Sequence, residues 1–418
     1  MQVEIKPTAI CGEVSAVASK SDAHRAIICS ALADGNTTIR ISHISKDIEA
    51  TLNCIKEMGA DFIRNDNLYE ISPIKERKIN PILDCGESGS TLRFLLPVLS
   101  ALGRGATFVG HGRLPERPMG LIVDLLKNHG NEFSSHKLPI TVSGKTEAGD
   151  FSVAGDVSSQ FISGLLFALP MLAEKSTIKL ISALQSSAYV DMTLNVLNKF
   201  GADIERSGDE FLINPIGTYK SPKEYIVEGD WSNAAFFMVM GALGGEITIK
   251  NLSLNSSQSD KRILDILKLS GVKFETSAGA IRVYKSKIKP FDYDVSQCPD
   301  LFPIMSILAC GAEGKSTLYN AKRLRIKESD RITTTKELIL NLGGRAEETE
   351  DSLTIYGNGK LEGGRVNSAN DHRIAMSAFA ASSISGGCVV LERAEAMDKS
   401  YPSFIEDFRS LGGMASVI

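Results

Sequence analysis

Two patterns of apolar and polar residues recur along the chain with the same period. In the first, an Ala- and Leu-rich segment ends at a break and is followed by a run in which β-branched and polar residues alternate. In the second, a Leu-rich helical stretch ends at a glycine and leads into another alternating run. The breaks of the first pattern are 70, 70, 70, 69 and 73 residues apart and fall at Gly35, Gly105, Lys175, Gly245, Gly314 and Gly387. The glycines of the second are 71, 71, 70, 73 and 69 residues apart and are Gly59, Gly130, Gly201, Gly271, Gly344 and Gly413. Two markers with one period predict six tandem copies of one structural unit.

Each copy is predicted to run helix, strand, helix, strand, strand. Apolar residues at helical spacing, such as Leu92, Leu95, Leu96 and Leu99, predict the helices. The glycine after each second helix suits a left-handed cap, and the alternating runs that follow predict strands. A helix between two strands favours a βαβ connection with parallel pairing.

Six such units are too many for one hydrophobic core, so we expect an α/β fold of two lobes with three units each. Residues 1–20 and 229–418 are predicted to form lobe I, and residues 21–228 lobe II. The strand at residues 3–5 precedes the first helix and would complete the last unit. The chain then crosses between the lobes twice, near Lys20 and near Gly229.

Composition and charge narrow the functional classes. Lys and Arg total 46 and Asp and Glu total 50, so the net charge of −4 disfavours nucleic acid as the main partner. No run of 18 apolar residues predicts a membrane span, and the first residues show no signal pattern. Seven scattered cysteines without a C-x-x-C pair indicate reduced thiols in a cytoplasmic protein, with no zinc site and no disulfide framework.

Charged residues gather where the first helix of each unit should begin. Ser, Asp and Asn at these positions can serve simply as N-caps. Three of the starts also carry cations: Lys20 and Arg25 at the first, Arg93 at the second and Arg373 at the last. Helix N-termini favour anions, and equivalent helix ends lie on equivalent faces of a repeat fold. If the two lobes face each other, these ends would point into one cleft suited to a small ligand with several phosphate or carboxylate groups.

Three further stretches allow two interpretations each. Residues 113–118 form either an exposed turn or a flap that clamps an anion through Arg113 and Arg117. Residues 322–331 are either a solvated charged helix start or part of a site. Residues 399–402, which begin with Lys399, are either a surface turn or a further anion contact.

Taken together, these motifs resemble those of the EPSP synthases, the 3-phosphoshikimate 1-carboxyvinyltransferases, over essentially the whole chain. The motifs that carry the resemblance are Lys20-Ser21-x-x-x-Arg25, Gly86-x-x-Gly89-x-x-x-Arg93, Glu116-Arg117-Pro118, Ser158-Ser159-Gln160, Lys327-Glu328-Ser329-Asp330-Arg331, Asp371-His372-Arg373 and Lys399-x-x-Pro402. The resemblance implies a two-lobed inside-out α/β barrel of βαβαββ units with the active site between the lobes. It also implies a monomer without a metal or organic cofactor.

The implied reaction moves the enolpyruvyl group of phosphoenolpyruvate to the 5-hydroxyl of shikimate 3-phosphate and releases phosphate, through a tetrahedral intermediate. The implied shikimate 3-phosphate contacts, mostly in lobe II, are Lys20, Ser21, Arg25, Ser158, Ser159, Gln160, Ser186, Tyr189, Asp300, Arg323 and Lys327. The implied phosphoenolpyruvate contacts, assigned mainly to lobe I, are Lys20, Gly89, Arg93, Arg117, Gln160, Arg331, His372, Arg373 and Lys399.

By the same resemblance, Asp300 is the candidate base and Glu328 the candidate acid, and Lys20 contacts both substrates. Lys327 and Arg331 stand close to Glu328 in the sequence and favour its ionised form. Glu328 can therefore act as a general acid only if burial or the charge of the substrates raises its pKa. Glu87 and Arg323 depart from the family pattern. Gly89 keeps the small residue associated with inhibition by glyphosate, which imitates phosphoenolpyruvate.

Two other functions are weighed against this one. The enolpyruvyl transferases that act on UDP-N-acetylglucosamine share the implied fold, but they carry a loop cysteine where this chain has Gly112. A nucleotide-handling repeat protein of the RNA 3′-terminal cyclase type would need a basic groove, which the net charge disfavours.

Overall fold

The computed structural model describes residues 1–76 and 78–418. Within these residues the strands form six four-stranded sheets. The chain divides into two compact units, which we call unit 1 (Met1–Val17 and Glu228–Ile418) and unit 2 (Ala18–Val227). Each unit has its own hydrophobic core. None of the described helices has the length and hydropathy that a membrane span requires.

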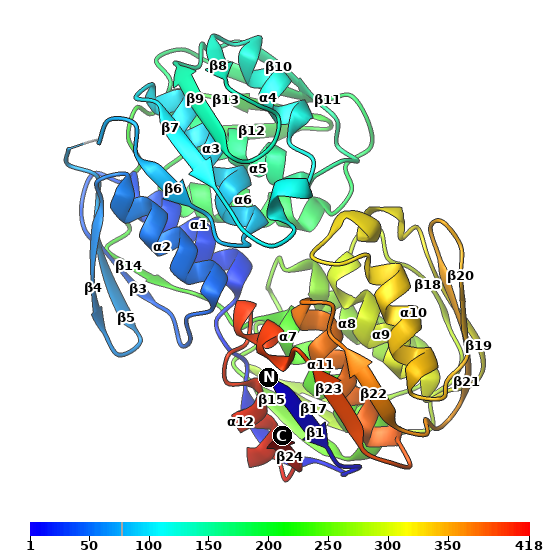
Figure 1. The fold of residues 1–418 in the computed structure, drawn as a ribbon. Coiled ribbons are helices and arrows are strands. Elements are labelled where there is room, and N and C mark those ends of the chain that lie inside the picture. Colours follow the sequence, from blue (N-terminus) through cyan, green and yellow to red (C-terminus); the bar gives the residue numbers. More distant parts are fainter. Residues whose placement is uncertain (77) are drawn as a thin grey trace. The chain divides into compact units, whose positions relative to one another are not determined.

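Unit 2 holds three of the sheets, and its helices alternate with its strands (Figure 1). Its helices are α1 (Lys20–Ala31), α2 (Lys46–Glu57), α3 (Gly89–Leu102), α4 (Gly120–Lys127), α5 (Ser159–Ala168) and α6 (Ser187–Lys199), with 3₁₀ turns η1 (Leu114–Glu116) and η2 (Leu169–Met171). Its strands are β3 (Thr37–Arg40), β4 (Asp61–Asn65), β5 (Leu68–Ser72), β6 (Ile82–Asp84), β7 (Ala106–Val109), β8 (Asn131–Phe133), β9 (Ile140–Gly144), β10 (Asp150–Val153), β11 (Ser176–Leu180), β12 (Ile204–Ser207), β13 (Glu210–Ile213) and β14 (Glu224–Ile226).

Unit 1 holds the other three sheets and both ends of the chain (Figure 1). Its helices are α7 (Trp231–Gly244), α8 (Ile263–Leu269), α9 (Phe302–Cys310), α10 (Arg331–Asn341), α11 (His372–Ala381) and α12 (Phe404–Ser410), with 3₁₀ turns η3 (Ser259–Arg262), η4 (Pro299–Leu301), η5 (Lys322–Ile326), η6 (Ser382–Ile384) and η7 (Ala394–Lys399). Its strands are β1 (Gln2–Ile5), β2 (Cys11–Ser15), β15 (Glu246–Lys250), β16 (Lys273–Ser277), β17 (Ala280–Tyr284), β18 (Asp292–Asp294), β19 (Glu313–Tyr319), β20 (Ala346–Glu348), β21 (Leu353–Asn358), β22 (Gly364–Asn367), β23 (Val389–Glu392) and β24 (Ala415–Val417).

All six sheets share one topology, which the sheet of β10 to β13 illustrates. The chain passes from β10 through α5 to the parallel strand β11, and then through α6 to the hairpin of β12 and β13. The hairpin pairs with β11 through its second strand, in antiparallel sense, so the order is β10-β11-β13-β12. Each repeat therefore begins with one more strand than the apolar pattern predicted. The predicted parallel pairing is confirmed only for the first two strands of each sheet. A short hairpin must be antiparallel, whereas the βαβ crossover gives parallel strands.

Three strands are exchanged along the chain to complete these sheets. The strand β14 comes from the end of unit 2 and pairs in parallel with β3. At the amino end, β2 pairs in parallel with β15, and β1 lies between β23 and β24. The prediction that the first strand completes the last unit is confirmed. The crossings between the units fall after Val17 and after Val227, where the sequence placed them near Lys20 and Gly229.

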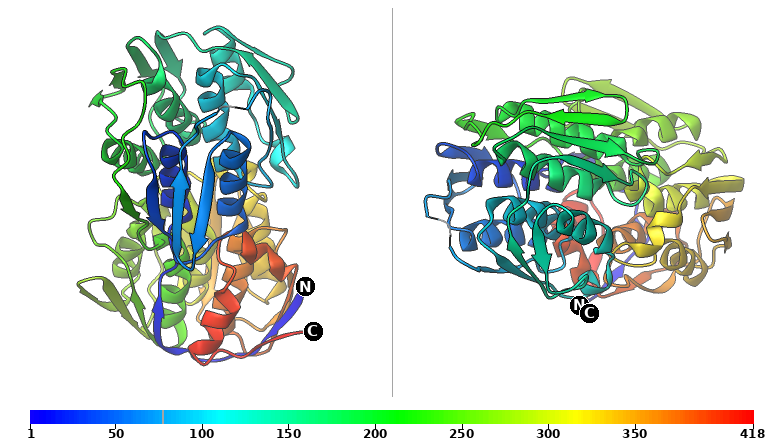
Figure 2. Two further views of the ribbon diagram at one scale, coloured as in Figure 1. Left: turned by 90° about the vertical axis from the view of Figure 1, so that its left-hand side faces the viewer. Right: turned by 90° about the horizontal axis from the view of Figure 1, so that it is seen from above.

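The first helix of each repeat is buried nearly all round, whereas the second is buried on one face. In α7 every residue from Trp231 to Leu243 is buried, while α2 buries only a face that includes Ile48, Leu52 and Ile55. The first helices are accordingly rich in Ala, Leu and Phe on all sides. Figure 2 shows the sheet of β3, β4 and β5 at the surface of unit 2, with helices behind it. Sheets outside and helices inside are the inside-out arrangement that the resemblance implied.

The glycine marker holds in four repeats and moves by one residue in two. Gly59, Gly130, Gly201 and Gly271 have positive φ values, as a left-handed helix cap requires. In the last two repeats the left-handed residue is the preceding glycine, Gly343 with φ 78° and Gly412 with φ 89°, rather than Gly344 and Gly413. A Gly-Gly pair offers two positions with the same backbone freedom, so periodicity alone could not choose between them.

Candidate active site

In unit 2, α1, α3 and α5 each start at a serine N-cap position. Ser19 and Ser88 accept hydrogen bonds from the backbone N–H of Asp22 and Thr91. Ser158 precedes α5 and makes no side-chain cap bond within the described part of the chain. Ser88 therefore acts as an N-cap, as the simpler interpretation of these residues proposed. The Ser158 hydroxyl does not cap its helix among the residues that the structure describes.

Arg25 brings together several residues that the sequence grouped around shikimate 3-phosphate. Its Nε donates to Thr193 Oγ1 at 2.8 Å, and its Nη atoms donate to the carbonyl oxygens of Ser21 at 2.5 Å and Tyr189 at 2.9 Å. The guanidinium lies over the ring of Phe94, 5.0 Å from its centroid. Burial lowers the pKa of Arg25 to about 10. A buried arginine held by neutral acceptors keeps an attraction for an incoming anion.

Ser186 belongs to the same group of residues. It stands immediately before α6 with a left-handed backbone, φ 55°, and its carbonyl accepts from Tyr189 N at 3.1 Å. The start of α6 therefore lies next to Arg25.

A second cluster joins α3 to α5. Arg93 Nη1 donates to Gln160 Oε1 at 2.7 Å, and Gln160 Nε2 donates to Ser90 Oγ at 2.9 Å. Arg93 also lies over the ring of Phe161, with 5.3 Å to the centroid. The structure thus brings together Arg93 and Gln160, which the sequence assigned to phosphoenolpyruvate. The adjacent Ser159 is buried at the start of α5.

The loop at residues 113–118 contributes one buried and one exposed arginine. Arg113 is exposed and pairs with Glu116 at 3.4 Å, whereas Arg117 is buried. A Cβ atom at Gly89 would collide with the Arg117 guanidinium, so a side chain there would displace it. The departure at Glu87 is also explained in part, because its carboxylate lies against Gly112 of this loop.

Lys20 forms an ion pair that the sequence did not predict. Its Nζ lies 2.8 Å from Asp47 Oδ2, and each side chain is 14% exposed. Asp47 stands in the first turn of α2, where acidic residues are common, so its sequence signal is indistinguishable from ordinary helix capping.

In unit 1, Arg331 is the centre of a buried network of carboxylates. It donates to Asp300 at 2.8 Å, to Glu328 at 2.7 Å and to Asp371 at 2.8 Å. The Arg331 side chain is 1% exposed and that of Asp371 is fully buried. Burial alone would lower the pKa of Arg331, but these three carboxylates outweigh it and raise the pKa well above its ordinary value. The charged run at residues 322–331 is therefore a buried cluster at its end and not a solvated helix start.

Asp300 is the point where this network meets other cations. Arg373 donates to its Oδ2 at 2.8 Å, and Lys327 Nζ lies 3.8 Å from its Oδ1. Burial would raise the pKa of Asp300, but Arg373, Lys327 and Arg331 hold it well below its usual range. Conversely, burial lowers the pKa of Lys327 to about 8, although Asp300 opposes the shift.

Two acidic residues, one within this network and one beside it, were not among the predicted site residues. Asp371 caps α11 by accepting from Arg373 N at 2.9 Å, while it also binds Arg331. Asp260 accepts from the Ser232 hydroxyl, and Ser232 accepts from Arg373 at 3.3 Å. Burial, and then the charge of Asp300, raise the pKa of Asp260 to about 6. Asp371 stood in a quoted motif, whereas Asp260 has no signal beyond a 3₁₀ turn.

The remaining predicted residues lie at different depths. Lys399 is buried and donates to the Asn370 carbonyl at 2.8 Å, so residues 399–402 are not a plain surface turn. His372 is buried in the first turn of α11. Arg323 is half-buried in η5, where its charge adds to the lowering of the Lys327 pKa.

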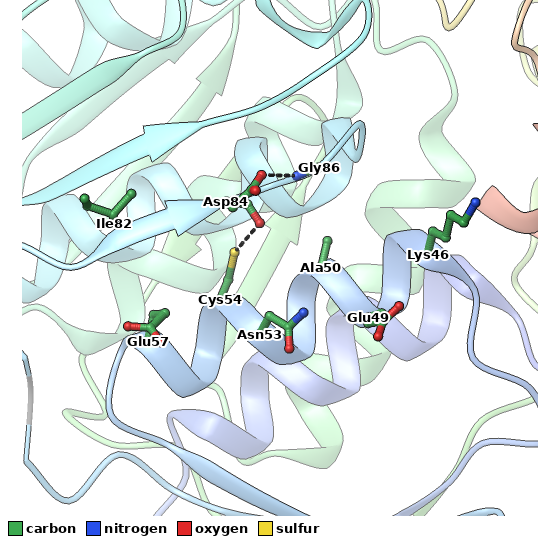
Figure 3. A pocket seen from close by; sticks show the side chains of 9 residues that line it. All are labelled: Lys46, Glu49, Ala50, Asn53, Cys54, Glu57, Ile82, Asp84 and Gly86. Atoms are coloured by element: carbon green, nitrogen blue, oxygen red, sulfur yellow. Dashed lines mark hydrogen bonds between the residues drawn. The ribbon is translucent and has the colours of Figure 1, made fainter.

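A cavity of about 230 Å³ in unit 2 does not match an anionic substrate. Figure 3 shows Glu49, Asn53 and Glu57 along α2, with Asp84 at the end of β6. Three carboxylates against the single ammonium of Lys46 would repel a phosphate. The arginine clusters described above therefore fit the predicted ligands better than this cavity does.

Comparisons with known proteins agree with one another over the full chain. A family model described as EPSP synthase (3-phosphoshikimate 1-carboxyvinyltransferase) matches residues 5–408. The 3-phosphoshikimate 1-carboxyvinyltransferase of Clostridium kluyveri is 45% identical over 98% of this chain and 97% of its own length. The protein of the same name from Brachyspira hyodysenteriae is 42% identical over 99% of each chain.

Solved structures show the same relationship. The EPSP synthase from Acinetobacter baumannii matches with a TM-score of 0.84 and 27% identity over 100% of both chains. The enolpyruvyl transferase NikO from Streptomyces tendae matches with a TM-score of 0.83 and 16% identity over 99% of this chain and 98% of its own, which shows a shared fold.

Proposed function

Because this chain belongs to the EPSP synthase family, we propose that it transfers the enolpyruvyl group of phosphoenolpyruvate to the 5-hydroxyl of shikimate 3-phosphate, with release of phosphate. The product is 5-enolpyruvylshikimate 3-phosphate, an intermediate of the shikimate pathway. Membership of the family confirms the resemblance drawn from the motifs. The observation that supports this chemistry best is the pair of buried clusters: arginines held by neutral groups in unit 2, and an aspartate among three cations in unit 1.

Shikimate 3-phosphate is proposed to bind mainly to unit 2. Its phosphate would be held by the hydroxyls before and at the start of α5 and by the Arg25 guanidinium, where the N-terminus of the helix adds partial positive charge. The carboxylate of Asp300 would accept a hydrogen bond from the 5-hydroxyl group. The proposed contacts are Lys20, Ser21, Arg25, Ser158, Ser159, Gln160, Ser186, Tyr189, Asp300, Arg323 and Lys327.

Phosphoenolpyruvate carries a carboxylate and a phosphate, both of which match guanidinium geometry. Bound between several cations, the two anionic substrates can approach each other despite their mutual repulsion. The proposed contacts are Lys20, Gly89, Arg93, Arg117, Gln160, Arg331, His372, Arg373 and Lys399.

The proposed chemistry has two stages. In the addition, the 5-hydroxyl oxygen attacks C2 of phosphoenolpyruvate, Asp300 accepts the hydroxyl proton, and Glu328 gives a proton to the methylene carbon. In the elimination, the new methyl group returns a proton to Glu328, the C2–O bond to phosphate breaks, and phosphate leaves with the proton that Asp300 had accepted. Arg331 holds Glu328 in place for this step, because it donates to Glu328 Oε2 at 2.7 Å.

One assay separates this function from the alternative. Mixing phosphoenolpyruvate with shikimate 3-phosphate should release phosphate at steady state, and replacing shikimate 3-phosphate by UDP-N-acetylglucosamine should release none. The reverse result would establish the UDP-N-acetylglucosamine enolpyruvyl transferase activity instead. The Gly112 position and the family match both favour the first outcome.

Three finer properties are proposed with this function. Glyphosate should inhibit the reaction, since Gly89 leaves room beside Arg117, and equal rates with and without millimolar glyphosate would contradict this. The seven free thiols support a reducing compartment such as the cytoplasm. The enzyme is expected to act as a monomer, which sedimentation would test.

A further inference from the structure

A line of four buried polar side chains runs from α1 through α2 to the start of α3. The Nδ1 atom of His24 lies 2.7 Å from Thr51 Oγ1, which lies 2.7 Å from Thr91 Oγ1. The Thr91 hydroxyl donates to Ser88 Oγ at 2.8 Å. All four side chains are at most 1% exposed. The line therefore connects three helices inside the core of unit 2.

The direction of these hydrogen bonds follows from the number of protons. Each hydroxyl has one proton, and that of Thr91 is given to Ser88. Thr91 must then accept from Thr51, and Thr51 must accept from His24. We therefore assign a proton to Nδ1 of His24 in this line.

The imidazole of His24 is neutral in this position. Burial lowers its pKa well below the ordinary value, and the nearby charges of Lys20 and Arg25 lower it further. Its Nε2 is buried without a hydrogen-bond partner in the described part of the chain. A neutral ring with its proton on Nδ1 has one acceptor for that proton, the Thr51 hydroxyl.

The two ends of the line adjoin the two proposed substrate contacts of unit 2. His24 precedes Arg25 on α1 and lies one turn after Lys20 and Ser21. Ser88 is the N-cap of α3 and precedes Gly89, and Arg93 follows on the next turn. The separation of these two helix starts sets the separation of the shikimate 3-phosphate contacts from the phosphoenolpyruvate contacts on α3.

We propose that His24, Thr51, Thr91 and Ser88 form a positioning strut that fixes the distance between the starts of α1 and α3, and so the spacing of the two substrates. The assignment of the substrates rests on the proposed function. The four residues act through Arg25, Gly89 and Arg93 and do not contact the reacting atoms.

Filling the core of unit 2 does not explain why these four buried side chains are polar. Hydroxyl and imidazole groups inside a core cost free energy unless they are hydrogen-bonded, and apolar residues of similar size would fill the space. A directed chain of hydrogen bonds instead specifies one spacing and orientation of the helices that it links. A reaction between two bound substrates is sensitive to such spacing, since a 1 Å error costs about 100-fold in rate.

The test removes the central hydroxyl and then restores it. Thr51→Val keeps the shape of the side chain but breaks both of its hydrogen bonds, and Thr51→Ser keeps the hydroxyl. Thr146→Val is the matched control, because it removes one buried hydrogen bond in the same unit, to Asn131 at 2.8 Å. Thr146 lies outside α1, α2 and α3.

In Thr51→Val we expect kcat to fall about 10- to 100-fold while the equilibrium affinity for each substrate alone changes little. Thr51→Ser should recover most of kcat, and Thr146→Val should keep it, with a comparable loss of thermal stability by circular dichroism. Unchanged kcat in Thr51→Val, an equal kcat loss in Thr146→Val, or failure of Thr51→Ser to recover would each overturn the strut.

A second measurement does not depend on activity. The ¹⁵N signals of His24, identified by comparison with His24→Gln, should show the Nδ1–H tautomer at pH 7 in the wild-type protein. They should change in Thr51→Val but not in Thr146→Val. A proton on Nε2 would contradict the strut, whereas absence of wild-type turnover with both substrates would instead contradict the proposed function.

Discussion

The two units hold their buried arginines in opposite ways. In unit 2, Arg25 is fixed by a hydroxyl, two carbonyl oxygens and an aromatic ring, and burial lowers its pKa to about 10. In unit 1, Arg331 is fixed by three carboxylates, and its pKa is raised well above the ordinary value. Both guanidiniums remain charged at neutral pH.

This difference separates two tasks. Asp22 only partly opposes the effect of burial on Arg25, whose pKa stays lowered, so Arg25 gains more from an incoming anionic group than Arg331 does. Arg331 is already neutralised by three carboxylates and therefore gains less free energy from an incoming anion. It instead holds these carboxylates in defined positions, as proton transfer requires. This contrast supports the proposal that unit 2 captures the phosphate and that unit 1 holds Asp300 and Glu328 for proton transfer.

The largest effect is expected from removing the carboxylate at the centre of unit 1. Asp300→Ala should lower kcat about 10²- to 10⁴-fold, because the 5-hydroxyl loses its base, while affinity for shikimate 3-phosphate falls far less. Binding can be followed by the fluorescence of the sole tryptophan, Trp231, which adjoins Ser232 in α7. The control is Asp265→Ala, on the exposed face of α8. A loss confined to binding would refute the base assignment.

The next effect concerns stability. Arg331→Met leaves Asp300, Glu328 and Asp371 without their shared cation, and unit 1 should lose about 3–5 kcal/mol of unfolding free energy. Because Trp231 is buried in unit 1, its fluorescence during urea denaturation reports the unfolding of that unit. A loss below about 1 kcal/mol would show that the carboxylates do not depend on this arginine.

In unit 2 the corresponding change should affect binding and leave the unfolding of unit 1 unchanged. Arg25→Met removes a charged donor, so the KM for shikimate 3-phosphate should rise about 10- to 150-fold, equivalent to roughly 1.5–3 kcal/mol. The urea midpoint reported by Trp231 should stay at the wild-type value. If Arg25→Met leaves KM unchanged, the contrast between the two units has no functional meaning.

The smallest effect is a pH dependence. Burial lowers the pKa of Lys327 to about 8, so this ammonium loses its proton above that pH in the folded protein. We expect kcat/KM to fall up to about tenfold per pH unit above 8, and the fall should move to higher pH in Lys327→Arg. An alkaline limb that Lys327→Arg does not move would exclude Lys327.

The lowered pKa of Lys327 also makes the free energy of unfolding depend on pH. Between pH 8 and its unfolded value of 10.5, the unfolded chain binds more protons at Lys327 than the folded chain does. This group therefore makes the folded state more stable as the pH rises through that range, because the buried charge is lost.

Much of the fold was predictable because the signals are local and repeated. Periodic glycines and apolar segments revealed six copies, and the N-cap residues located most first helices. The fifth repeat was less regular, since η4 precedes α9 there. Periodicity did not reveal the additional first strand of each unit, which only the resemblance implied, because strands as short as β6 and β14 have little periodicity.

The residues of the site divide in the same way. The sequence named residues within recognisable motifs, such as Arg25, Arg93 and Arg331, and the structure places each of them in a buried hydrogen-bonded cluster. Asp47 and Asp260 were not found, because an acidic residue in a first turn or a short 3₁₀ turn is ordinary in any helical protein. Their partners, Lys20 and Ser232, lie 27 and 28 residues away along the chain.

The sequence by itself determined the six repeats, the family and the positions of most helix starts, because each depends on residues close together in the chain. Only the tertiary structure decided which charges neutralise each other, which remain to attract a ligand, and that His24 reaches Ser88 through two threonines. The reason is physical: hydrogen bonds and ion pairs act over a few ångströms of space, and distant segments enter that range only when the helices pack.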